Sequence, residues 1–83
     1  MNLYLLTQNN NNGWDTYDSC VVVANSEEEA RLIHPNGDIW NGHKYPSRSR
    51  SWANTPDSVM VELIGNAINL KENTVVISSF NAG

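Results

Sequence analysis

The chain has 83 residues and a net charge of −4, with nine acidic and five basic side chains and one cysteine. A chain of this length forms one domain (residues 1–83) that buries roughly 60–65% of its unfolded surface, so its stability alone is modest. The acidic balance argues against general binding to a nucleic-acid backbone, and the single Cys20 excludes an internal disulfide.

Two further classes of protein do not fit the composition. The two histidines, His34 and His43, have no paired cysteines or metal-ligand spacing, so we expect no metal and no cofactor. No apolar run reaches the roughly 20 residues that cross a bilayer, and the N-terminus lacks a secretory signal. The expectation is therefore a soluble cytosolic protein without a membrane partner.

The first predicted element is a strand over residues 2–8, whose sequence NLYLLTQ is apolar on both faces and typical of a well-covered strand. Residues 9–15, NNNNGWD, are turn material, because Asn and Gly tolerate left-handed backbone geometry. This stretch is interpreted as a loop between two antiparallel strands. The functional alternative is a rim that presents Trp14, Asp15 and Tyr17 to a ligand.

A strand followed directly by a helix is the clearest local pattern. Residues 20–24 are apolar and mostly β-branched, which favours a strand. Ser26 and Glu29 have the spacing of a capping box, in which Glu29 is expected to reach back to the Ser26 N–H. The helix is predicted to place Arg31 outward and to stop before Pro35, whose ring disfavours helical geometry in the preceding residue.

A long irregular stretch, residues 36–56, follows the helix and is rich in Gly, Pro, Ser and Asn. Its aromatic side chains argue against disorder, because they would be costly to leave in water. Strands are then predicted over residues 58–64, with Val59, Val61 and Leu63 on one face, and over residues 74–80. The order strand, strand, helix, long loop, strand, strand predicts an α+β fold, with about four antiparallel or mixed strands and one helix on one face.

The basic segment, residues 43–52 (HKYPSRSRSW), is the first candidate binding site. Lys44, Arg48 and Arg50 are three of the five positive side chains, and guanidinium groups match the oxygens of phosphate. Tyr45 and Trp52 could stack on a base. The alternative is a solvated basic loop that balances the acidic helix start.

Residues 14–19, WDTYDS, are the second candidate, since they come just before a strand. Asp15 or Asp18 could accept a hydrogen bond from a ribose hydroxyl, or the stretch could simply be a turn. No nucleophile is spaced beside Asp18 and His34, so we do not expect an enzyme.

Several motifs together resemble a group of short accessory proteins of bacteriophages and prophages. They are LYLL, NNGWDTYDSCVVVANSEEEARLIHP, PDSVMVELIGNA and VVISSFNAG, and they cover nearly the whole chain except about residues 36–51. The SEEEAR helix start is generic, whereas its combination with GWDTYDS and SFNAG is more specific. The resemblance implies a viral accessory protein in the infected host's cytosol, and it carries no catalytic residue across.

Small phage accessory proteins of this kind often act against host defence, and one class sequesters a nucleotide immune signal without cleaving it. By this resemblance we expect a homo-oligomer in which Lys44, Arg48 and Arg50 meet phosphates. Trp14, Tyr17 or Trp52 would stack on the base, and Asp18 would accept from a ribose hydroxyl. The alternative is an inhibitor that covers a host defence complex through its acidic surface.

Overall fold

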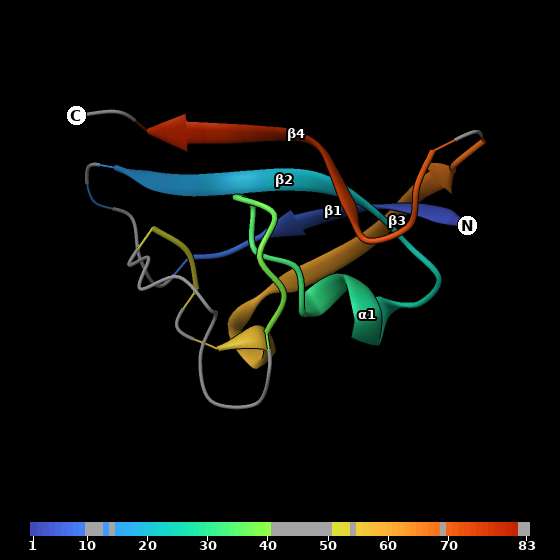
Figure 1. The fold of residues 1–83 in the computed structure, drawn as a ribbon. Helices are drawn as coiled ribbons and strands as arrows, with labels where there is room; N and C mark the ends of the chain where they lie inside the picture. The colour runs from blue at the N-terminus through green and yellow to red at the C-terminus, as the bar shows by residue number, and fades with distance from the viewer. Residues whose placement is uncertain (10–12, 14, 41–50, 54, 69, 82–83) are drawn as a thin grey trace.

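The computed structural model describes residues 1–9, 13, 15–40, 51–53, 55–68 and 70–81. One sheet with strand order β3-β1-β2-β4 forms the body, and all of its pairings are antiparallel. This confirms the predicted small α+β fold with one short α-helix in the described part (Figure 1). The elements are β1 (Asn2–Thr7), β2 (Thr16–Ala24), α1 (Glu27–Arg31), the 3-10 helix η1 (Pro56–Ser58), β3 (Met60–Asn66) and β4 (Thr74–Asn81).

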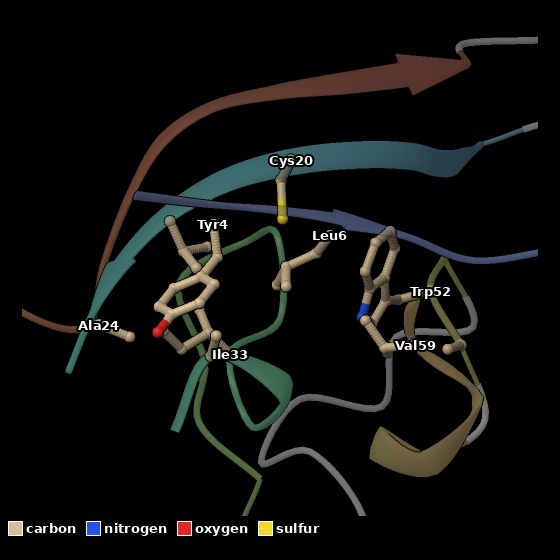
Figure 2. Close-up of a cluster of buried hydrophobic side chains, with 10 residues drawn as sticks. Tyr4, Leu6, Cys20, Ala24, Ile33, Trp52 and Val59 are labelled. Carbon is tan, nitrogen blue, oxygen red and sulfur yellow. The ribbon is translucent and has the colours of Figure 1, made fainter. Parts of the chain in front are cut away.

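One face of the sheet is covered and supplies most of the hydrophobic core. Tyr4 of β1 lies opposite Val22 of β2, and two residues further along Leu6 lies opposite Cys20. Side chains at directly opposite positions point to the same side of a sheet, and α1, the 32–40 segment and η1 are gathered over this side (Figure 1). The buried cluster consists of Tyr4, Leu6, Cys20, Val22, Ala24, Ala30, Ile33, Trp52, Ala53 and Val59 (Figure 2).

Trp52 is the largest side chain in this core and is only 1% exposed. The segment that carries it is tied to β2, because the Tyr17 N–H donates to the Ser51 carbonyl at 2.6 Å. Figure 2 shows the Trp52 ring beside Val59, on the same side of the sheet as Leu6. The end of the long irregular stretch is therefore part of the packed body.

The start of α1 follows the capping prediction with one change of partner. The Ser26 Oγ accepts from the Glu29 N–H at 3.2 Å, as a capping box requires. The Glu29 Oε2 accepts from the Asn25 N–H at 3.1 Å, so the predicted return bond to the Ser26 N–H is wrong by one residue. Both bonds still satisfy backbone donors at the helix entry, where no intrahelical acceptor is available.

The end of α1 differs from the prediction in two ways. The helix ends at Arg31, with Leu32 as C-cap. Its last residue lies four positions before Pro35, so the helix stops earlier than the proline requires. Arg31 is half-buried, and its Nη1 donates to the Val59 carbonyl at 2.5 Å. The prediction that Arg31 points outward is therefore wrong, because its long side chain lies across to the residue that precedes β3.

The predicted alternation in β3 holds at its start and fails towards its end. Val59, just before the strand, is 2% exposed and Val61 is partly buried, but Leu63 is 58% exposed. Leu63 lies opposite Tyr4, next to a register shift between β1 and β3. β3 is an edge strand, and the short α1 leaves this part of it uncovered.

Replacing Trp52 with Ala should lower the free energy of unfolding by about 3–5 kcal/mol, since it removes the largest buried side chain and leaves a cavity. Urea denaturation measures the loss, and Trp52→Phe should fold with a smaller one. Ile68→Ala is the matched control, because Ile68 is 78% exposed and should change stability by less than about 0.5 kcal/mol. Equal losses for Trp52→Ala and Ile68→Ala would contradict the packing described.

Candidate functional site

A cluster of three rings lies where β2 begins and where the chain returns from the basic segment. The His34 ring meets Tyr17 edge to face, with centroids 5.9 Å apart and planes at 87°. On another side it meets Trp52, with centroids 6.5 Å apart. His34 and Trp52 are fully buried, while Tyr17 is partly buried. The cluster joins three segments that are far apart in the sequence.

The backbone around His34 forms a tight turn with the sequence Pro35-Asn36-Gly37. The His34 N–H donates to the Asp38 carbonyl at 2.7 Å, and the Gly37 N–H donates back to the His34 carbonyl at 2.8 Å. Gly37 has a φ of 101°, in the region that favours glycine. The Asn36 N–H donates to the His34 Nδ1 at 3.0 Å, so the neutral ring carries its proton on Nε2.

The pKa of His34 is lowered from its ordinary value by burial, which disfavours the charged imidazolium. The Asp38 carboxylate and a hydrogen bond with the Asn36 side chain act in the opposite direction, and burial outweighs them. The ring is therefore neutral at pH 7 and acts as a packed, hydrogen-bonded centre of the turn.

Both ends of the stretch between Trp40 and Ser51 are held close to this cluster. The Trp40 N–H donates to the Leu32 carbonyl at 2.7 Å, and the Tyr17 N–H donates to the Ser51 carbonyl at 2.6 Å. Ile33 and Ile39 form an antiparallel bridge beside the first of these bonds. Trp40 and Ser51, the described residues on either side of positions 41–50, are thus both fixed by backbone hydrogen bonds.

The structure brings Tyr17 and Trp52 together, but as part of the core. Tyr17 presents its ring to His34, and its carbonyl accepts from the Gln8 Nε2 at 3.0 Å. Trp52 is 1% exposed, so its ring faces are occupied by protein atoms. The predicted stacking of a base on Trp52 does not agree with this burial.

Asp15 and Asp18 are both exposed, near the turn that precedes β2. Asp15 has a φ of 59°, in keeping with the turn interpretation, and the Thr16 Oγ1 donates to the Gly13 carbonyl at 2.7 Å. Asp18 lies at a register shift between β2 and β4, which leaves its carboxylate in solvent. The predicted site residues Trp14, Lys44, Arg48 and Arg50 lie outside the described residues.

Cys20 is a structural thiol of the core, as the sequence predicted. It is 2% exposed and forms no disulfide, and burial raises its pKa to about 12. A thiol in this state is a poor nucleophile, because the thiolate is the reactive form. The described contacts of His34 and Cys20 therefore belong to the turn and to the core.

His34 should make the protein less stable in mild acid. Its folded pKa lies below its unfolded value of 6.5, so the unfolded chain binds the proton more readily, and stability falls as the pH drops below about 6.5. Urea unfolding at about pH 7.5 and about pH 5.5 measures the loss, which should shrink in His34→Gln. His43→Gln is the control, and a loss that follows His43 would contradict this assignment.

Cys20 should resist alkylation by iodoacetamide in the native protein at neutral pH, because burial keeps it protonated and inaccessible. It should react fully after unfolding in urea, as mass spectrometry would show. Rapid native labelling, at the rate of an unfolded peptide with the same sequence, would contradict the burial of this thiol.

Among the described residues, no three His, Cys, Asp or Glu side chains come together in a way that could hold a metal ion. The helices in that part of the chain are all too short or too polar to cross a bilayer. Comparisons with models of protein families, with curated proteins and with solved structures found no match. The function of this chain is therefore inferred from its own residues.

Proposed function

We propose that this chain is an accessory protein of a bacteriophage or prophage that binds a nucleotide-type signal of host defence. It holds the signal in the host cytosol without cleaving it. The observation that carries the proposal is the anchoring of Trp40 to the Leu32 carbonyl and of Ser51 to the Tyr17 N–H, on either side of the stretch with most of the positive charge. Binding residues are commonly placed on loops whose ends are fixed by a rigid scaffold.

The distribution of positive charge supports an anionic ligand. Arg31 is engaged with the Val59 carbonyl, and Lys71 is exposed between β3 and β4. The remaining three positive side chains, Lys44, Arg48 and Arg50, lie within seven residues of one another. Forked guanidinium donors and an ammonium group together suit a ligand with more than one phosphate.

Two described residues support a nucleotide over a simple phosphate. Asp18 has an exposed carboxylate that can accept a hydrogen bond from a ribose hydroxyl. The N–H of Tyr17, its neighbour in the chain, donates to the Ser51 carbonyl at the base of the basic segment. In this proposal Trp14 stacks on the base, while Trp52 supports the segment from within the core.

Binding without cleavage fits the chemistry of the buried groups. His34 is neutral and fully enclosed, and the Cys20 thiol has its pKa raised to about 12. Neither group is placed to activate water or to attack a phosphate, since both tasks need an accessible reactive form.

Isothermal calorimetry against a panel of cyclic nucleotides and cyclic ADP-ribose relatives tests the proposal, with submicromolar binding of at least one expected. Arg48→Ala with Arg50→Ala should weaken it tenfold or more, because each hydrogen bond to a charged group contributes roughly 1.5–3 kcal/mol. Lys71→Ala is the control and should leave the affinity unchanged. The bound ligand should be recovered intact after the protein is denatured.

Absence of binding across the panel would refute the nucleotide proposal, and unchanged affinity in the double Arg variant would refute the site. Recovery of a cleaved product would replace sequestration with catalysis.

The acidic surface favours a second candidate, an inhibitor that covers a host defence complex. All nine acidic side chains lie in the described part, and all but Asp38 are exposed. Three of them, Glu27, Glu28 and Glu29, are adjacent on α1. Complementary charge speeds encounter with a basic protein surface. Under this candidate Glu27→Lys with Glu28→Lys would weaken capture of a purified defence complex, and nucleotides would not bind.

A further inference from the structure

We propose that two copies of this chain associate through the outer edges of their β4 strands. The strands pair antiparallel about a twofold axis, so that one continuous sheet runs through both copies. This inference is independent of the nucleotide proposal, because β4 contains none of the residues assigned to the ligand.

β4 is the last strand of the order β3-β1-β2-β4. One side of it pairs with β2 from Thr16 to Val23, and no strand of the described chain pairs with the other side. An edge strand presents a row of backbone donors and acceptors that a further strand can satisfy.

β4 also lacks two of the features by which proteins usually protect an edge, a charged residue and a proline. Its sequence, TVVISSFN, contains no charged residue and no proline, whereas natural edges commonly carry Lys, Pro or an inward charge. The opposite edge, β3, carries the exposed Glu62. The pairings of both edge strands contain register shifts, so the charge is what distinguishes the two edges. Because β3 carries this charge and β4 carries none, pairing through β4 closes at two copies and does not propagate.

The exposed side chains of β4 also favour pairing along its edge. Successive side chains of a strand alternate between the faces, yet Val76, Ile77, Ser78 and Ser79 are all exposed. Ile77 is 65% exposed and Val76 is 48% exposed. From Val76 to Ser79 the strand is therefore open on both faces as well as along its edge, which is costly for β-branched apolar side chains.

Pairing would extend an apolar strip that already crosses the second face of the sheet. Ile77 lies opposite Val21, and Val21 lies opposite Leu5. These three side chains line a shallow depression of about 170 Å³, together with Ser19, Cys20, Ser78 and Ser79. A twofold axis perpendicular to the sheet keeps this face on the same side in both copies, so the strip would continue across the paired β4 strands.

A second copy suits this edge better than an unrelated strand. Each chain has a net charge of −4, so two copies repel unless their contact avoids charge. Cross-strand like charges are destabilising, and Thr74–Asn81 contributes none. The register shift between Val21 and Val22 disrupts the strand near Val76, so the regular pairing would run from Ile77 to Asn81.

Sedimentation velocity over a range of concentrations tests the proposal. The wild-type protein should be dimeric at micromolar concentration, and Ile77→Lys should weaken the dimer at least tenfold, because lysine blocks edge pairing. Ile68→Lys is the matched control. Ile68 is 78% exposed and lies between β3 and β4, so this variant should remain dimeric.

Hydrogen exchange identifies the edge involved. Amides of β4 should gain protection as the protein concentration rises, while those of β3 should not. A wild-type protein that stays monomeric, whether or not it binds some other partner, overturns the proposal. So does an Ile77→Lys dimer of unchanged affinity, or protection that appears at β3.

Discussion

The covered face of the sheet is buried largely by Trp52 and the residues around it, and the remainder of the structure depends on this burial. α1 has five residues, so it is roughly 7 Å long. The outer strands of a four-stranded sheet are roughly 14 Å apart. A helix of this length cannot cover the sheet, and the face is completed by Trp52, Ala53 and Val59 from beyond the irregular stretch. The core therefore closes only when a segment distant in the sequence returns to β2.

This arrangement couples stability to the candidate site. Ser51, which accepts the hydrogen bond from Tyr17, immediately precedes Trp52, so the anchor of the basic segment and the centre of the core are adjacent residues. His34 joins the two by contacting both rings. Loss of ligand binding in a Trp52 variant would thus not show that Trp52 contacts the ligand, because the variant also disturbs the core. The double Arg variant leaves Ser51 and Trp52 unchanged, so it is the better test of affinity.

The regular elements could be predicted because their signals are local. Alternating or continuous apolar residues indicated all four strands, and the Ser26 and Glu29 pair located the start of α1. The end of α1 was missed, because Pro35 was interpreted only as a helix terminator. The Pro35-Asn36-Gly37 sequence is itself a strong turn signal. The turn that it forms carries Trp40 back to the Leu32 carbonyl, so the chain has left the helix by that point.

The errors at side chains have a different origin. The outward position of Arg31 follows from helical spacing alone, but the location of the Val59 carbonyl depends on how β3 returns to the sheet. Trp52 lies two residues from Arg50 and has the character of either a ligand-stacking or a core residue. Its burial results from tertiary packing that no local pattern contains. The local sequence therefore indicates the chemical character of Arg31 and Trp52, but their positions in the fold depend on long-range contacts that it does not contain.

Electrostatics constrain how an anionic ligand could be held by an acidic protein. The net charge of −4 repels such a ligand at a distance, although salt screens this repulsion beyond about 8 Å at physiological ionic strength. Positive side chains that paired with the protein's own exposed carboxylates would gain only about 0–1 kcal/mol each. A phosphate accepting hydrogen bonds from charged donors gains roughly 1.5–3 kcal/mol for each bond. Under the proposed function, a ligand with several phosphates would displace such pairs, and its affinity would come from slow release and not from fast, electrostatically steered capture.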